Sequence, residues 1–347
     1  MKYANAYLCY SPQNFVKALR LAHAAHARGE RSKILAWIGP ELADAPFFDG
    51  RGVSWADVEV RRHPHRYVRL LDRDRARPLV LAGKLARKAW SRARRVLATT
   101  ETRALLAALA DAEDVHLFLE TTWYSDAVLR ERRCTLVEEG VASYLPVRGL
   151  SRADGSPRYP GEHPNVRRVL LQRPDAAPPS VRAKVEPLEL DYAALPADAR
   201  RELLALFGME HFAARGRAAI VVGQAWSCSS VEPDSVRGAH ARIVAELGRR
   251  GFAVHVKPHP NEDADAYRAL GAELLDPRLP LEVFELLERP HPFECAVSLL
   301  SSSLANAPRL ARRVYRPEDG ALVVEDVTPE RFDELARGTL AALARSD

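Results

Sequence analysis

The chain has 347 residues, of which 47% are hydrophobic and 28% charged, and a formal net charge of +5 at pH 7. This length allows two domains with separate cores, and the composition is that of a soluble globular protein. No apolar run of about 18 residues is present, which argues against a spanning helix, and the four scattered cysteines lack the paired spacing of a metal site.

The first part of the chain predicts alternating strands and helices. A buried strand at Ala6–Tyr10 precedes a helix at Asn14–Ala27 and a second strand at Ile34–Ile38. Further on, the pattern predicts strands at Val115–Leu119 and Thr135–Val137, separated by a helix at Ser125–Arg132. The N-terminus lacks the pattern of a signal peptide, so we expect a cytoplasmic protein.

A strongly basic segment, Arg61–Arg95, lies within this first part. It holds thirteen Lys and Arg residues against two acids, Asp72 and Asp74, and its later portion reads as helical. One interpretation is a solvated, arginine-rich helical face. The other is a patch for an anionic partner, either an acidic substrate chain or the surface of the inner membrane. No nucleic-acid recognition motif accompanies the charge, so we expect no nucleic-acid partner.

The middle of the chain, from Pro146 to Pro196, is rich in proline and charge and has weak strand signals at Val169–Leu171. Its composition predicts a surface excursion and a connection between domains. From about Asp198 the alternation resumes. Strands are predicted at Ala218–Val222, Phe252–Val256, Glu273–Leu275 and Ala296–Leu300, and helices at Val236–Arg249, Ala264–Leu270, Leu281–Leu287 and Pro329–Ala344. Such alternation predicts a parallel, doubly wound sheet in each half of the chain, with a cleft between the two.

Three short motifs follow predicted strands. Glu138-Glu139-Gly140 comes after one apolar run, Lys257-Pro258-His259-Pro260 after another, and Ser301-Ser302-Ser303 after a third. The carboxyl ends of parallel strands are where open α/β sheets bind ligands. A carboxylate can remove a proton from a hydroxyl, and a histidine can assist a departing phosphate. Together the motifs predict a glycosyl transfer site.

These motifs resemble those of bacterial sialyltransferases, the capsule-type polysialyltransferases and the lipooligosaccharide enzymes, which carry an acidic-acidic-Gly, a His-Pro and a serine motif. The segment Ser11-Pro12-Gln13 is similar to the Ser/Thr-Pro-x-Gln pattern after the family's first strand, although Gln13 here follows Pro12 without the gap. The strand before Gln224 also looks like the first donor-domain strand. The wide separation between acid pair and His-Pro resembles the polysialyltransferase branch.

The resemblance implies the GT-B fold, α/β with two Rossmann-like domains facing an interdomain cleft. We place the acceptor domain, with the basic helical segment, at residues 1–197 and the CMP-sugar domain at residues 198–347. It also implies an inverting, metal-independent transfer of sialic acid from CMP-sialic acid to a glycan hydroxyl, with no cofactor. The product would be a surface polysaccharide such as capsule or lipooligosaccharide.

The resemblance and the residue chemistry together assign roles. Glu138 is the expected general base with Glu139 as second candidate, and His259 is expected to protonate or hydrogen-bond the departing phosphate. Serine hydroxyls at the start of a helix form a phosphate site, and CMP carries a single phosphate, which they and His259 could neutralise without a cation. Residues expected at the donor are Lys257, Pro260, Glu282, Ser301, Ser302, Ser303 and Gln224; those expected at the acceptor, which is a glycan, acidic or lipid-linked, are Ser11, Gln13 and the basic segment Arg61–Arg95.

Two alternatives stay open. A GT-B transferase using another CMP-linked ulosonic acid, such as Kdo, would share the leaving group and the catalytic logic. A protein of the same fold that binds an acidic glycan without turnover would share the basic segment. Release of CMP in the presence of an acceptor distinguishes the transferases from the binding protein.

Overall fold

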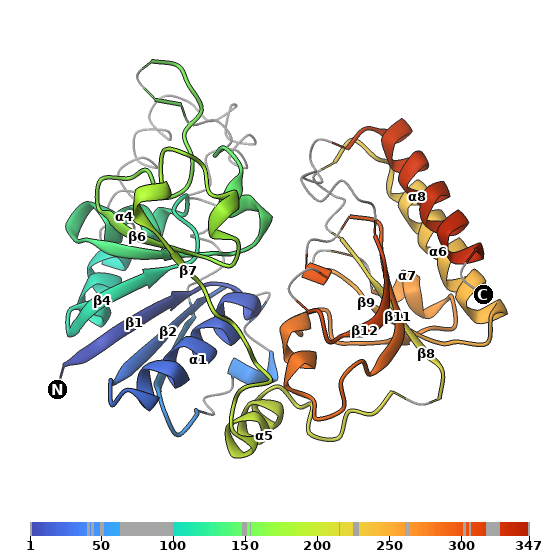
Figure 1. Ribbon diagram of the computed structural model, residues 1–347, viewed down its shortest axis with the longest axis horizontal. Coiled ribbons are helices and arrows are strands. Elements are labelled where there is room, and N and C mark those ends of the chain that lie inside the picture. The colour runs from blue at the N-terminus through green and yellow to red at the C-terminus, as the bar shows by residue number, and fades with distance from the viewer. Residues whose placement is uncertain are drawn as a thin grey trace, which may run out of the picture. The chain divides into compact units, whose positions relative to one another are not determined.

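The computed structural model describes residues 2–39, 42, 45–48, 52–62, 100–147, 151–152, 154–214, 216–224, 229–260, 262, 264–300, 303–304, 307–316 and 327–345. The chain divides into two compact units, Met1–Leu190 and Asp191–Asp347. Each unit is built on its own parallel sheet with helices against it (Figure 1).

The sheet of the first unit runs in the order β3-β2-β1-β4-β5-β6-β7, and every pairing is parallel. Its strands are β1 (Tyr3–Cys9), β2 (Ser32–Ile38), β3 (Asp57–Arg62), β4 (Ala112–Leu117), β5 (Cys134–Val137), β6 (Val166–Leu171) and β7 (Val185–Pro187). The strand order reverses between β1 and β4. The carboxyl ends on both sides of such a reversal are the usual ligand-binding edge of an open parallel sheet.

Helix α1 (Pro12–Ala27) follows β1 directly. Ser11 is its N-cap, accepting a hydrogen bond from the N–H of Asn14 at 3.1 Å, and Pro12 occupies the first turn, where no backbone donor is needed. The helix buries an apolar face that includes Phe15 and Leu19. The other short elements of this unit are α4 (Trp123–Glu131), η2 (Pro46–Phe48), η4 (Val141–Tyr144), η5 (Pro174–Ala176) and η6 (Arg182–Lys184), and residues 100–109 are also helical.

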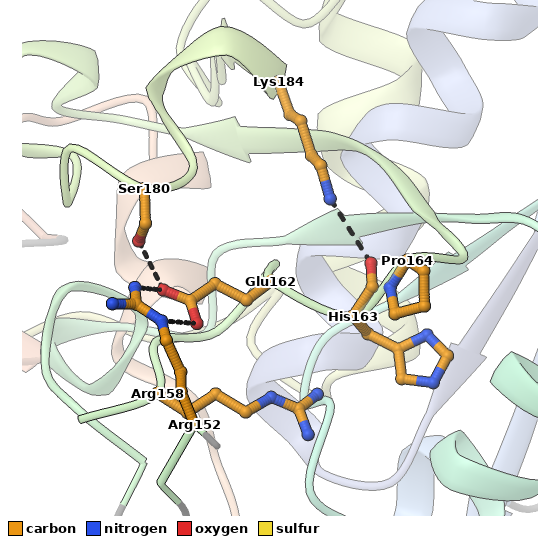
Figure 2. A pocket seen from close by; sticks show the side chains of 7 residues that line it. All are labelled: Arg152, Arg158, Glu162, His163, Pro164, Ser180 and Lys184. Atoms are coloured by element: carbon orange, nitrogen blue, oxygen red, sulfur yellow. Dashed lines mark hydrogen bonds and ion pairs between the residues drawn. The ribbon is translucent and has the colours of Figure 1, made fainter. Parts of the chain in front are cut away.

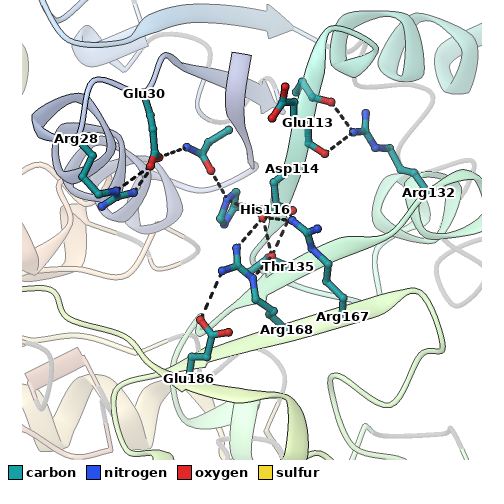
Figure 3. Close-up of polar contacts among 12 residues, drawn as sticks. Arg28, Glu30, Glu113, Asp114, His116, Arg132, Thr135, Arg167, Arg168 and Glu186 are labelled. Carbon is teal, nitrogen blue, oxygen red and sulfur yellow. Dashed lines mark hydrogen bonds and ion pairs between the residues drawn. The ribbon is translucent and has the colours of Figure 1, made fainter. Parts of the chain in front are cut away.

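A buried polar network ties neighbouring strands of this sheet together (Figure 3). The carboxylate of Asp114 on β4 accepts hydrogen bonds from Thr135 on β5 at 3.0 Å and from Arg168 on β6 at 2.7 Å, and Arg167 also lies 2.7 Å from it. Burial raises the pKa of Asp114, but His116, Arg167 and the hydrogen bond from Thr135 outweigh it and hold that pKa below its ordinary value. Because the carboxylate stays charged and paired, the network fixes the register of β4, β5 and β6.

The second unit has a smaller sheet in the order β10-β9-β8-β11-β12, again wholly parallel. The strands are β8 (Ala218–Val222), β9 (Ala253–Lys257), β10 (Glu273–Leu274), β11 (Phe293–Ser298) and β12 (Ala311–Tyr315). The helices are α5 (Ala197–Leu206), α6 (Pro233–Arg249), α7 (Asp265–Arg268), η8 (Leu281–Leu286) and α8 (Pro329–Ala344), and α6 and α8 lie side by side (Figure 1). Ile243 of α6, Val256 of β9 and Phe332 of α8 belong to one core cluster.

The predicted alternation is confirmed in both halves, and β8 and α8 have the expected bounds. Within Pro146–Pro196, β6 confirms the weak strand signal at Val169–Leu171. The prediction of a surface excursion and connection was wrong for this part, because the passage supplies β6 and β7, and Val169 and Leu171 are part of the first unit's core. Strands β3 and β12 were not predicted, because their residues are mostly half-buried or exposed and lack an apolar run. The two compact units divide between Leu190 and Asp191, a little before the expected boundary at 197/198, which falls in α5.

Within the described part of the chain, none of the helices combines the length and the apolar character needed to cross a membrane.

Candidate functional site

In the second unit, the residues expected at the donor follow neighbouring strands at the sheet's carboxyl edge. Gln224 comes after β8 and His259 after β9, and these two strands pair directly. The sheet order reverses between β8 and β11, so the ends of these strands lie at the reversal point. The fold therefore brings the strand ends carrying Gln224 and His259 together at the edge where such sheets bind ligands.

The environment of His259 favours a neutral ring. Burial lowers its pKa to about 4, and the nearby Lys257 adds to the effect. At neutral pH the imidazole of the ligand-free protein is therefore uncharged. A neutral imidazole still carries one N–H donor, and an anion placed beside it would favour its protonated form.

Lys257, at the end of β9, is turned toward the backbone. Its ammonium group donates to the carbonyl of Pro277 at 3.0 Å and to that of Pro258 at 3.3 Å. Burial lowers the pKa of Lys257 to about 8, opposed by the charge of Glu282. Glu282 itself is 2% exposed at the start of η8. Lys257 is half-buried, and the nearby charge of Glu282 favours its protonated form.

The remaining donor candidates fall at two other places. Pro260 is exposed at the turn after β9. Ser303 is in 3₁₀ conformation and is half-buried, whereas Ser301 and Ser302 lie outside the described residues. The serine motif follows β11, the strand across the reversal point from β8.

In the first unit, the acid pair follows β5, and its two members have different environments. Glu138 is 4% exposed, and its carboxylate accepts hydrogen bonds from the backbone of Gln172 at 2.7 Å and from the side-chain amide of Gln172 at 3.0 Å. The hydroxyl of Tyr144 donates to the same carboxylate. Glu138 thus anchors η4 and the end of β6 against the end of β5.

Glu139 is half-buried. Burial raises its pKa above the ordinary value, opposed by the neighbouring Tyr10 and by the charge of Lys17. The hydroxyl of Tyr10 approaches the carboxylate, but it does not complete a well-aligned hydrogen bond. A carboxyl group with a raised pKa is a stronger base once ionised, which suits a general base near neutral pH.

The pattern of the sequence did not point to Lys17, although it holds the acid pair in place. This lysine is fully buried on α1, and its ammonium group donates to the carbonyl of Glu138 at 3.1 Å and to that of Glu139 at 3.0 Å. The only available signal was a lysine among the apolar positions of a helix. Its contacts link the helix after β1 to the strand end of β5.

The residues expected at the acceptor are only partly described. Ser11 caps α1 and Gln13 lies in its first turn, beside the carboxyl end of β1. Of the basic segment Arg61–Arg95, only Arg61 and Arg62 at the end of β3 belong to the described residues, and the rest lies outside them.

A surface cavity of about 560 Å³ in the first unit gathers several charged side chains (Figure 2). Arg152 pairs with Glu162, which also accepts from Ser180, and Arg158 pairs with the buried Glu120. Lys184 donates to the carbonyl of His163 at 3.3 Å. Because Glu162 and Glu120 neutralise the two arginines, we interpret this cluster as internal bracing of residues 154–184 against Arg152 and the segment after β4.

None of the curated proteins matches this chain. Among solved structures, a putative UDP-N-acetylglucosamine 2-epimerase from Listeria monocytogenes has a TM-score of 0.51 at 11% identity, covering 100% of this chain and 92% of its own. A sialyltransferase from Photobacterium damsela has a TM-score of 0.49 at 8% identity, covering 96% of this chain and 79% of its own. The fold is that of the GT-B enzymes, as expected from the sequence.

The family model described as alpha-2,8-polysialyltransferase matches residues 124–313. The match begins on α4, contains the acid pair and the His-Pro motif, and ends on β12. It covers more than half of the chain. The chain therefore belongs to the alpha-2,8-polysialyltransferase family and is a glycosyltransferase, which takes a sugar donor and a glycan acceptor.

Proposed function

We propose that this protein transfers sialic acid from CMP-sialic acid to a hydroxyl of a glycan acceptor, with inversion at the anomeric carbon and without a metal ion or other cofactor. One observation carries the proposal. In a member of the polysialyltransferase family, His259 and Gln224 follow paired strands at the reversal point of the second unit's sheet. A ligand edge that offers a histidine suits a donor whose leaving group is a single phosphate.

On the donor side, His259 donates a hydrogen bond to the phosphate as CMP departs. The ring is neutral in the ligand-free protein because its pKa is lowered to about 4. A bound phosphate raises that pKa by its negative charge, so the ring gains proton-donating capacity when the donor is present. Gln224, Lys257, Pro260, Glu282 and the serines Ser301, Ser302 and Ser303 complete the proposed donor site.

On the acceptor side, the acid pair supplies the general base. The motif position assigns this role to Glu138, whose orientation is held by Tyr144 and Gln172. The environment favours Glu139, because burial raises the pKa of its carboxyl above the ordinary value and makes it a stronger base once ionised. Ser11 and Gln13, at the start of α1, and the basic segment Arg61–Arg95 are proposed to bind the acceptor.

Matched substitutions identify the base. Glu138→Gln and Glu139→Gln each keep size and hydrogen-bonding capacity but remove the carboxylate. We expect the variant of the true base to lose about 10² to 10⁴ in kcat with CMP affinity unchanged, whereas the other variant loses far less. Single-turnover CMP release and CMP titration measure the two quantities. Full turnover in both variants would remove the acid pair from the mechanism.

The primary test is release of CMP from CMP-sialic acid in the presence of an acceptor. CMP-Kdo in the same assay tests the alternative donor, which the shared CMP leaving group keeps open. We expect turnover with CMP-sialic acid to survive EDTA, and loss of turnover on chelation would contradict the metal-free mechanism. Binding of an acidic glycan without any CMP release would support the non-catalytic alternative.

The cellular setting follows from the same proposal. In this proposal the protein uses its CMP-sugar donor on the cytoplasmic side. The product would be a surface polysaccharide such as capsule or lipooligosaccharide. A lipid-linked acceptor and the basic segment would together hold it at the inner membrane.

A further inference from the structure

A carboxylate that the sequence motifs do not include joins the ends of β8 and β9. The side chain of Glu262 accepts a hydrogen bond from the backbone N–H of His259 at 2.7 Å, and the backbone N–H of Gln224 donates to the same carboxylate. The backbone N–H of Glu262 in turn donates to the carbonyl of His259 at 2.9 Å. Glu262 thus joins the two residues that the proposed function places at the donor, and we call these hydrogen bonds to the backbone of His259 and Gln224 the Glu262 bracket.

Two further side chains, those of Tyr267 and His240, support the carboxylate of Glu262. The hydroxyl of Tyr267 donates to the other carboxylate oxygen at 3.0 Å and lies 2.9 Å from Nδ1 of His240. His240 is 1% exposed on α6. Since the tyrosine proton goes to the carboxylate, the tyrosine oxygen accepts from Nδ1–H of a neutral histidine. Every hydrogen-bond donor in this series, from Nδ1–H of His240 to the backbone N–H of His259, therefore has an acceptor.

The neighbouring glycine leaves room for this arrangement. A Cβ atom at Gly223 would lie 1.9 Å from a carboxylate oxygen of Glu262 and 3.0 Å from the backbone nitrogen of His259. The backbone N–H of Gly223 donates to the carbonyl of Lys257 at 2.9 Å. Any side chain at this position would displace the carboxylate from the bracket.

We propose that Glu262, supported by Tyr267 and His240, is a positioning residue. It sets the position of the His259 side chain and of the Gln224 backbone at the carboxyl edge of the second unit's sheet, where the donor is proposed to bind (the donor edge). The proposal rests on the proposed function for the roles of His259 and Gln224. Because Glu262 accepts hydrogen bonds from the backbone N–H groups of both residues, any effect of Glu262 on the donor acts through them.

A double-mutant cycle tests this coupling. We expect Glu262→Ala to lower kcat for CMP release about ten- to hundredfold, since small misplacements of a catalytic group cost this much. In a His259→Ala background, where the backbone N–H remains but the imidazole is gone, the same substitution should cost less than about threefold. Equal factors in both backgrounds would overturn the proposal.

Glu285→Ala is the matched control. Glu285 is also a buried carboxylate of the second unit and accepts a backbone N–H, that of Arg309, at 2.7 Å. Its loss should multiply with that of His259→Ala, because it does not contact the donor edge. Coupling of His259 to Glu285 as large as its coupling to Glu262 would mean a general effect on stability and would contradict a positioning role.

Two more variants guard against misfolding. In Glu262→Gln the amide oxygen can still accept from both backbone N–H groups while its NH₂ faces Tyr267, so we expect most of the lost activity to return. Gly223→Ala leaves Glu262 in the sequence but pushes its carboxylate aside, so we expect a loss similar to that of Glu262→Ala. Wild-type kcat in Gly223→Ala would count against the bracket.

Amide hydrogen exchange gives a readout that needs no turnover. The backbone amides of His259 and Gln224 should be protected in the wild type, exchange faster in Glu262→Ala and stay protected in Glu285→Ala. A wild-type protein without CMP release would defeat the proposed function, yet exchange would still test the bracket. Unprotected amides at His259 and Gln224 in the wild type would refute the bracket itself.

Discussion

Burial shifts the titration of several side chains in the second unit. It lowers the pKa of His259 to about 4 and that of Lys257 to about 8, and it raises that of Glu285 to about 7. In each residue the main cause is loss of water around the side chain, which penalises the charged form. A region that disfavours charge also strengthens the electrostatic attraction between a bound phosphate and its partners. His259 and Lys257, at the end of β9, are therefore poised to change charge when a donor arrives.

Glu285 provides a test of this effect on stability. Its carboxyl has a folded-state pKa of about 7 against an ordinary value of 4.5, so the folded protein holds a proton that the unfolded chain releases between these values. Stability contributed by the neutral group is present below about pH 4.5 and is lost as pH rises to about 7. We expect Glu285→Gln, which keeps an acceptor for the N–H of Arg309, to gain about 1–3 kcal/mol on the wild type between pH 5 and pH 8.

Chemical unfolding at the two pH values measures this difference. Glu288→Gln makes the same substitution at an exposed residue of the same region and is the control. A constant offset for Glu285→Gln across the same range would show that burial does not hold this carboxyl protonated.

At the level of elements, the proposed acid pair depends on a contact between helix α1 and the end of β5. The acid pair follows β5, and Lys17 of α1 holds both of its carbonyls. The helix is thereby fixed to a strand end that lies far along the sequence. Any shift of α1 would move the backbone of Glu138 and Glu139 together.

Ser11 shows how a structural and a binding role can be separated. Its hydroxyl caps α1, so Ser11→Ala should lower the free energy of unfolding by about 1 kcal/mol, while Ser11→Asp, another good cap, should retain it. If Ser11 also binds the acceptor, both variants should raise the acceptor KM. Urea unfolding and acceptor titration measure the two effects, and unchanged stability in Ser11→Ala would disprove the capping role.

At the level of the whole molecule, the two units divide the proposed work between them. The acid pair belongs to Met1–Leu190 and the His-Pro motif to Asp191–Asp347. The basic segment Arg61–Arg95 belongs to the first unit by sequence, which is the unit expected to bind the acceptor. An acidic acceptor chain attracted by this charge would bind less tightly as salt rises.

Replacing several arginines of Arg61–Arg95 by glutamine tests that role. We expect the KM for long acidic acceptors, or the partition onto anionic vesicles, to worsen severalfold while CMP affinity stays unchanged, because each lost charge weakens attraction to a polyanion or an anionic surface. The exposed Arg242 and Arg312 of the second unit supply a charge-matched control. Equal losses for donor and acceptor would indicate that the segment stabilises the fold instead.

Much of the architecture was readable from local patterns. Apolar runs such as Ala218–Val222 predicted buried parallel strands, because a strand buried on both faces must be continuously apolar. Patterns failed where burial is one-sided or the run is short. Strand β7 therefore gave no signal and β6 only a weak one at Val169–Leu171, although β6 packs in the core.

Contacts between distant residues needed the folded chain. A lysine in an apolar helix face and a glutamate after a His-Pro motif carry no periodic signal, so neither the hold of Lys17 on the acid pair nor the bracket of Glu262 could be read in advance. The different surroundings of Glu138 and Glu139, adjacent in the sequence, likewise arise only when Tyr144, Gln172 and α1 pack around them. Residue types and their order specify which strands form and what chemistry follows them, whereas hydrogen-bond partners and burial depend on which surfaces the fold brings together.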